Sequence, residues 1–373
     1  MPPDFAAEGL LDGLDGDARA ARERLLRRLH DEGVSLEDLR AACREERLVL
    51  LPAERLIGGS ARYTGTEIAE RAGVEPELLA ALRRAQGLPV SDLDARIFTD
   101  ADLEGARTAR AFRDAGVAPE QMLAVTRVLG RGLSQAAELM RNTTLDLVLE
   151  PGTPEDELAL RYAEAASRLE PLTAPMLGQM LNLHLRHVVR GEVIDAASRE
   201  TGELPGARDV TVAFADLVGF TRIGEEVPPD ELSAVAGRLE DLAAEHLRHP
   251  VRLVKTLGDA VMLVSGEPRP LLEMTLDLVA AADAEGEQFP QLRAGLACGR
   301  ALSRAGDWYG APVNLASRVT DRARPGSVLV TRELRDTVGE DGLRCSFAGE
   351  KRLKGIRDPV PLFRIRREDS NDR

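Results

Sequence analysis

Two aspartates, Asp216 and Asp259, are the residues of this sequence best suited to bind a cation. Asp216 ends an alternating apolar segment that begins at Val210, and Asp259 lies in a Gly-Asp turn between two apolar arms. The end of a strand and the tip of a neighbouring hairpin can bring two carboxylates together, and adjacent carboxylates repel unless a cation lies between them. The spacing leaves two interpretations open: two divalent metal ions held by the pair, or two aspartates that each cap a turn.

The segment Gly219-Phe220-Thr221 follows the first of these strands and favours contact with an anion. Glycine lets backbone N–H groups approach a ligand, and the N-terminus of a helix favours phosphate. The sequence therefore predicts a phosphate contact next to the candidate cation site.

Four more residues have the chemistry to contact a substrate: Lys255, Asp307, Asn314 and Arg318. Lys255 lies on the first arm of the expected hairpin, and Asp307 lies in the expected loop Arg304 to Gly310. Asn314 and Arg318 are four positions apart and therefore share one side of a helix. Each residue also has an ordinary interpretation as a solvated surface group, and the residues alone leave both interpretations open.

The elements that would position these residues follow Ser198 to Arg208, a Gly- and Pro-containing segment that is the best domain boundary. The pattern after it predicts strands at 210–214, 251–256, 260–264, 292–298, 327–330, 345–347 and 360–364, and helices at about 229–249, 270–285, 312–322 and 332–338. Strands and helices interleaved with hairpins predict an α+β or mixed α/β domain.

Residues 1–200 predict helices only, because no convincing strand alternation occurs before residue 205. Among the expected helices are 119–129, 134–149, 155–169 and 172–199, with Pro171 in the last gap. We therefore predict an all-helical domain over residues 1–200, including a linker helix, and a second domain over residues 201–373.

Within the first domain, Tyr63 to Val90 resembles a helix-turn-helix, which raises DNA recognition as an alternative function. The second helix would open with Glu75-Pro-Glu77 and bring carboxylates towards phosphate. The net charge of −14 also opposes nucleic-acid binding, because neutralising phosphates needs a basic surface. An ordinary helical hairpin is the interpretation that we favour.

The composition favours a soluble cytoplasmic protein. A hydrophobic content of 43% is enough for real cores, and the three widely spaced cysteines indicate reduced thiols. The N-terminus does not combine a positive region with an apolar core, so no secretory signal is evident. The longest uncharged, largely apolar stretch, around Leu172 to Leu185, falls short of the roughly 20 apolar residues needed to span a bilayer.

Three stretches of the second domain resemble the signature motifs of class III adenylate cyclases. They read Phe214-Ala-Asp-Leu-Val-Gly-Phe-Thr221, Lys255-Thr-Leu-Gly-Asp-Ala-Val-Met262 and Gly306-Asp-Trp-Tyr-Gly-Ala-Pro-Val-Asn-Leu-Ala-Ser-Arg318. The resemblance covers about Arg208 to Arg367. It implies an α+β catalytic domain with a ferredoxin-like core.

The resemblance implies a role for each motif residue. Asp216 and Asp259 match the aspartates that bind two divalent cations, Mg²⁺ or Mn²⁺. Lys255 and Asp307 match the pair that reads adenine, where guanylate-specific relatives carry Glu and Cys. The remaining matches are Asn314, which orients the ribose, and Arg318, which stabilises the transition state. Gly219, Phe220, Thr221 and Lys354 are further candidate substrate contacts.

The implied reaction is attack of the ATP 3′-hydroxyl on the α-phosphorus, with pyrophosphate as the leaving group. In this family the catalytic domain works as a head-to-tail homodimer with shared sites. One subunit supplies the two aspartates and the other supplies the remaining four residues. A catalytically silent nucleotide-binding dimer is the alternative, which retention of all six positions opposes.

The N-terminal domain resembles, less specifically, the autoregulatory domain of actinobacterial members, which acts as a pH sensor. Four histidines lie near the domain junction or on the first long catalytic helix: His184, His187, His246 and His249. Histidine titrates near neutral pH. The group therefore supports the hypothesis that protonation changes how helix 172–199 couples the two domains, although each histidine alone reads as a solvated residue.

Overall fold

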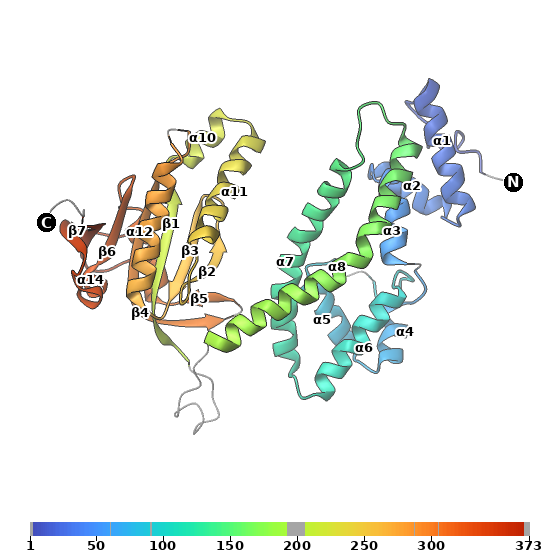
Figure 1. Ribbon diagram of the computed structural model, residues 1–373. Coiled ribbons are helices and arrows are strands. Elements are labelled where there is room, and N and C mark those ends of the chain that lie inside the picture. The colour runs from blue at the N-terminus through green and yellow to red at the C-terminus, as the bar shows by residue number, and fades with distance from the viewer. Residues whose placement is uncertain are drawn as a thin grey trace. The chain divides into compact units, whose positions relative to one another are not determined.

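The computed structural model describes residues 3–59, 61–89, 92–191, 206–286, 288–304 and 306–368. The chain folds as two compact units that divide between Arg190 and Gly191 (Figure 1). Each unit is described by itself.

The first unit is helical throughout its described residues. Its elements are α1 (Gly16–Asp31), α2 (Leu36–Arg44), the 3₁₀ helix η1 (Leu48–Leu50), α3 (Leu51–Gly58), α4 (Gly65–Ala72), α5 (Pro76–Gln86), α6 (Asp100–Asp114), α7 (Pro119–Asp146) and α8 (Glu155–Gly191). Within the described ranges, the strand-type pairing in this unit is one isolated bridge between Tyr63 and Phe98. The predicted all-helical character is confirmed.

Two helices are longer than the sequence predicts. The segments 119–129 and 134–149 fall in the single 28-residue helix α7, which ends at Asp146. The segments 155–169 and 172–199 fall in the 37-residue helix α8, which ends at Gly191, and residues 192–199 of the prediction lie outside the described residues. The break expected at Pro171 is therefore wrong. Pro171 and Pro175 both occupy exposed positions of α8, so water can take the place of the backbone bonds that proline removes.

The helix-turn-helix-like segment is a helical hairpin held by an apolar core. Gly73, in the left-handed conformation at φ 68°, ends α4, and α5 begins at Pro76. Ile68 of α4 and Leu79 of α5 are buried in one cluster with Phe98. The expected second helix thus lies where predicted, up to Gln86, and Val90 lies outside the described residues.

The second unit is built on one mixed sheet. Its strands are β1 (Arg208–Leu217), β2 (Arg252–Thr256), β3 (Ala260–Ser265), β4 (Leu292–Arg304), β5 (Asp307–Tyr309), β6 (Ser327–Thr331), β7 (Leu343–Lys351) and β8 (Val360–Arg367). They follow the order β2-β3-β1-β4-β6-β8-β7, with β5 paired to β4. Only the β4–β6 pairing among these strands is parallel, which agrees with the predicted α+β class.

Helices cover both faces of this sheet. They are α10 (Phe220–Glu226), α11 (Pro229–His246), α12 (Pro268–Ala284), α13 (Ala311–Thr320) and α14 (Arg332–Val338). In Figure 1, α11 and α12 run across the sheet, and their buried leucines pack with Ala213, Ala215 and Leu217 of β1. The opposite face, with Val210, Val212 and Phe214, packs under α13. We call these the α12 face and the α13 face.

The region predicted as the loop Arg304 to Gly310 forms a strand instead. β4 continues beyond the predicted end at Cys298 to Arg304, and β5 pairs back onto it with Asp307 opposite Arg304. The sequence does not predict this hairpin, because the outer part of β4 is polar and largely exposed and shows no apolar alternation. Its pairing depends on the backbone.

No helix in the described parts of the chain has the length and apolar character that crossing a membrane requires.

Candidate active site

Asp216 lies on the α13 face of the sheet, near the end of β1. Successive side chains of a strand alternate between faces, and Phe214 packs on the α13 face while Ala215 and Leu217 pack on the other. Asp216 is therefore the polar end of an otherwise apolar row. Its side chain is 18% exposed.

Asp259 is held next to Asp216 by the β1–β3 pairing. Asp216 is paired with Ala260, and the backbone N–H of Leu217 donates to the carbonyl oxygen of Asp259 at 2.8 Å. Burial raises the pKa of Asp216, and the negative charge of Asp259 raises it further. The predicted neighbourhood of a strand end and a hairpin tip is present in the backbone, where it makes Asp216 and Asp259 neighbours.

Arg293 is a third member of this cluster that the motifs did not indicate. It lies directly opposite Asp216 in the β1–β4 register, and its Nε and Nη2 donate to one carboxylate oxygen at 2.8 and 2.5 Å. This contact opposes the rise in the pKa of Asp216. An arginine between Leu292 and Ala294, inside an apolar strand, is the sequence signal that could have identified it.

The two aspartates fit a divalent cation whose remaining ligands are water and substrate phosphates. The carboxyl of Asp216 is partly desolvated beside a second carboxylate, and a positive group, Arg293, already occupies the position where a cation would be attracted. Among the described residues, no group of three or more His, Cys, Asp or Glu side chains is placed so that it could hold a metal ion. Mg²⁺ is typically bound by one or two carboxylates together with water and substrate phosphates, which suits this pair.

Lys255 and Asp307 form an ion pair on the α13 face. The Nζ of Lys255 donates to Oδ2 of Asp307 at 2.5 Å, and both side chains are about one-third exposed, at 35% and 29%. The β2–β3 register shifts between Leu253, opposite Leu263, and Lys255, opposite Met262. This bulge places Lys255 on the face of Met262, which belongs to the α13-face cluster.

Asp307 is held on its other side by its own strand. The backbone N–H of Trp308 donates to Oδ1 of Asp307 at 2.8 Å, and the Trp308 side chain is buried, at 4% exposure. The predicted Lys–Asp pair is therefore brought together, at the start of a strand that the sequence did not predict.

The helix α13 carries Asn314 and Arg318 one turn apart. Asn314 is exposed, and the Arg318 side chain is 43% exposed and pairs with Asp321 at 3.3 Å. The helix lies directly on the sheet, because Gly295 of β4 leaves no side chain between them: an added Cβ there would lie 2.2 Å from the backbone nitrogen of Thr320. The opposite side of α13 is free to present both polar groups.

The remaining candidate substrate contacts lie at the start of α10 and in the turn between β7 and β8. Gly219, at φ 79°, precedes the seven-residue helix α10, with Phe220 half-buried against the core and Thr221 exposed. Lys354 is exposed in the turn between β7 and β8. The neighbouring Leu353 is buried in one apolar cluster with Val319 of α13, which ties the Lys354 turn to that helix.

The histidines of the regulatory hypothesis have few described contacts. His184 is exposed on α8, and the side chain of His187 lies outside the described residues. The Nδ1 of His246 lies 2.9 Å from the carbonyl oxygen of Leu242, one turn earlier in α11. A fifth histidine, His30, packs edge-on against Phe5, and its buried Nδ1 has no hydrogen-bond partner in the described structure.

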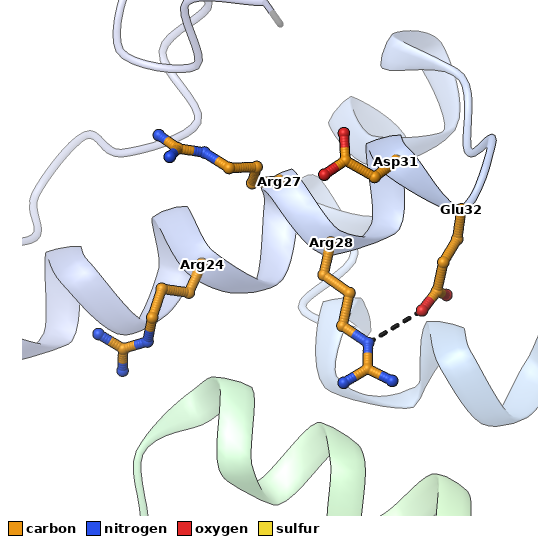
Figure 2. A pocket seen from close by; sticks show the side chains of 5 residues that line it. All are labelled: Arg24, Arg27, Arg28, Asp31 and Glu32. Atoms are coloured by element: carbon orange, nitrogen blue, oxygen red, sulfur yellow. Dashed lines mark hydrogen bonds and ion pairs between the residues drawn. The ribbon is translucent and has the colours of Figure 1, made fainter.

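A shallow recess on α1 gathers positive charge but does not form an anion site. Its lining consists of Arg24, Arg27, Arg28, Asp31 and Glu32, and Figure 2 shows Arg28 paired with Glu32. Arg24 pairs with Asp156 of α8, and Arg27 pairs with Glu23. Since each arginine already has a carboxylate partner, the recess joins α1 to α8 and leaves no unpaired cation.

Two family models match this chain, one in each part. Residues 3–189 match the family model of the adenylate cyclase regulatory domain, and residues 204–366 match that of the adenylate and guanylate cyclase catalytic domain. A pH-sensitive adenylate cyclase of Mycobacterium tuberculosis is 47% identical over 98% of this chain and 92% of its own length. An adenylate cyclase of Streptomyces coelicolor is 34% identical over 77% of this chain and 74% of its own.

Among solved structures, the adenylyl cyclase CyaB from P. aeruginosa aligns with 44% of this chain and 96% of its own at 21% identity. Its TM-score of 0.38 is too low to bear on the fold.

Proposed function

Because the chain belongs to the class III adenylate cyclases that carry an N-terminal regulatory domain, we propose that it converts ATP to 3′,5′-cyclic AMP and pyrophosphate. The observation that carries this proposal is the Lys255–Asp307 ion pair. The bulge in β2 brings Lys255 to the sheet face of Met262, which is also the face of Asp216.

Lys255 and Asp307 supply the hydrogen-bond pattern that adenine requires. A carboxylate accepts from the exocyclic N6 amine, and an ammonium donates to ring N1, whereas guanine presents the reverse pattern at these positions. Both groups are already oriented, because Lys255 and the Trp308 backbone each hold one oxygen of Asp307. We propose that this pair selects ATP over GTP.

Asp216 and Asp259 would hold two divalent cations, Mg²⁺ or Mn²⁺. When bound, these ions acidify the 3′-hydroxyl and neutralise charge on the phosphates. The contribution of the chain itself is to hold both carboxylates at one point of the sheet, through the pairing of β1 and β3. Arg293 must leave Asp216, or share it, when a cation binds.

Asn314 and Arg318 would act on the ribose and on the reacting phosphate. The guanidinium can donate several hydrogen bonds to the oxygens that gain charge as the new P–O bond forms and the bond to pyrophosphate breaks. Positioning of the hydroxyl by Asn314 makes the attack intramolecular and in line. Gly219, Phe220, Thr221 and Lys354 are proposed contacts of the triphosphate.

We further propose that two chains associate head to tail, so that each site combines the aspartates of one subunit with Lys255, Asp307, Asn314 and Arg318 of the other. Complementation tests this arrangement together with the activity. Full-length Asp216→Ala and Arg318→Ala, each inactive alone, are mixed and assayed for cyclic AMP with Mn²⁺. Mixed dimers would hold one intact site, so up to about a quarter of wild-type activity should return. A mixture that stays inactive, while wild type is active and the variants form mixed dimers, would contradict the shared site.

Regulation by pH is the finer proposal for the helical unit. It rests on the histidines near the junction and on the pH-sensitive relative. The test compares the pH–activity profile of full-length wild type with that of the double variant His184→Gln and His187→Gln. An unchanged profile would remove these two histidines from the proposal.

A further inference from the structure

The indole of Trp308 is the anchor of the short strand that carries Asp307. β5 has three residues, and a three-residue pairing with β4 holds a ribbon only weakly. The Trp308 side chain is buried with Val210, Val212 and Ala301, whereas Tyr309 on the same strand is 57% exposed. Burial of this one side chain therefore fixes where β5 lies, and with it the backbone N–H that holds Asp307.

One side of the indole is covered by an arginine from the start of β1. The guanidinium carbon of Arg208 lies 5.0 Å from the centre of the Trp308 ring, within the range of a cation–π contact. Arg208 is paired with Ala301 of β4, and the preceding carbonyl, of Ala207, accepts a hydrogen bond from Arg300 at 2.8 Å. Two contacts thus join the beginning of β1 to the β4–β5 hairpin.

We propose that Arg208 and Trp308 are positioning residues for base recognition, which set the orientation of Asp307 from outside the substrate site. This inference rests on the proposed reading of adenine by Lys255 and Asp307. A shift of the indole also moves the backbone N–H of Trp308. The Asp307 carboxylate, which accepts a hydrogen bond from that backbone N–H, must then follow or lose the bond. An arginine suits this position because its guanidinium covers the face of the indole at the edge of the apolar cluster.

The same contacts couple the position of the first described residues of the second unit to the position of Asp307. Ala207 and Arg208 are among the first described residues after the junction between the two units. A displacement of the chain at this point is passed to the β4–β5 hairpin, and so to Asp307. The parameter that should respond is the affinity for the base, measured as KM for ATP and as the preference for ATP over GTP.

The test uses the full-length protein with Arg208→Gln, which removes the cation, and Arg208→Lys, which keeps it. Arg335→Gln is the matched control, since Arg335 lies 4.2 Å over the Phe363 ring of the same unit, on α14, away from the base-reading pair. For an exposed cation–π contact we expect Arg208→Gln to raise KM for ATP about 2- to 5-fold. The ratio of kcat/KM for ATP to that for GTP should fall by a similar factor, and Arg208→Lys should restore most of both.

Trp308 also gives a readout that does not depend on turnover, because it is the only tryptophan of the chain. Its emission should change on ATP binding, and half-saturation should shift in Arg208→Gln but not in Arg208→Lys or Arg335→Gln. The proposal would be overturned if Arg208→Gln showed the same KM for ATP, the same preference for ATP over GTP and the same ATP titration as the control Arg335→Gln. A wild type that binds ATP with this fluorescence signature but forms no cyclic AMP would instead overturn the proposed function, and leave the positioning role supported.

Discussion

The ion pair between Arg293 and Asp216 makes a prediction about metal binding that can be tested without measuring turnover. Arg293 donates two hydrogen bonds to the carboxylate of Asp216, one of the two candidate metal ligands. A metal ion that binds Asp216 must therefore compete with a guanidinium of the same chain. Replacing Arg293 by glutamine removes the competitor and leaves a polar side chain of similar length.

The expected loss of stability follows from the burial of the pair. The side chains of Asp216 and Arg293 are 18% and 29% exposed, so solvent only partly compensates for the lost partner. Leaving a half-buried carboxylate unpaired beside Asp259 should lower the free energy of unfolding by about 1 to 3 kcal/mol. Added Mn²⁺ should return more stability to Arg293→Gln than to wild type, because it supplies the missing positive charge.

The pH dependence has a definite sign. Burial holds the pKa of Asp216 above its ordinary value, so the folded state binds a proton more readily than the unfolded state. This group therefore favours folding below its unfolded pKa, and that contribution is lost as pH rises through the folded pKa. In Arg293→Gln the pKa rises further. The deficit relative to wild type should thus be largest near neutral pH and shrink as acid neutralises Asp216.

The assay is direct Mn²⁺ binding by electron paramagnetic resonance, since a chain with two units need not unfold in one step. We expect Arg293→Gln to bind Mn²⁺ about tenfold more tightly than wild type, which corresponds to about 1.4 kcal/mol of competition. Arg300→Gln, on the same strand but bonded to a backbone carbonyl, should bind as wild type does. Equal or weaker binding by Arg293→Gln would refute the competition.

Three further predictions concern the base, the transition state and the support of α13. The double change Lys255→Glu and Asp307→Cys should lower the ATP-to-GTP ratio of kcat/KM by about 100-fold or more, and an unchanged ratio would exclude this pair as the base reader. Arg318→Ala should lower kcat by about 100- to 1000-fold without changing the melting temperature, since its side chain is 43% exposed and makes a surface contact. Gly295→Ala should cost about 1 to 3 kcal/mol in thermal denaturation and also lower kcat, because its Cβ would lie 2.2 Å from a backbone nitrogen of α13. Gly237→Ala, with open space around the added methyl, should not be destabilising.

The residue types alone were sufficient to single out the candidate site residues. Asp216, Asp259, Lys255 and Asp307 stand in motifs whose residue types differ from their apolar surroundings, so the pattern exposes them. Arg293 was not predicted, because its role depends on the partner that β1 presents across the sheet. Strand register is a long-range property, and the alternation of one strand does not specify which residue of another lies opposite.

For the helices of the first unit, the prediction was wrong because it relied on a local rule. Local rules predicted a break at Pro171, since proline removes a backbone hydrogen bond. The helix α8 nevertheless continues to Gly191. A local preference of a few kcal/mol does not end a helix of this length when both prolines occupy exposed positions and water can satisfy the freed carbonyls.

Lys255 shows how far function can depend on a feature that no hydrophobic pattern encodes. In a regular strand it would share the face of Leu253, which packs with the α12-face cluster, where an ammonium without a partner would be costly. The bulge at Val254 inserts one residue into β2, so the pairing passes from Leu253–Leu263 to Lys255–Met262. Lys255 then points to the face on which Asp307 lies, 2.5 Å from its Nζ. The motif supplies the lysine, but a one-residue irregularity in register decides that it meets the aspartate.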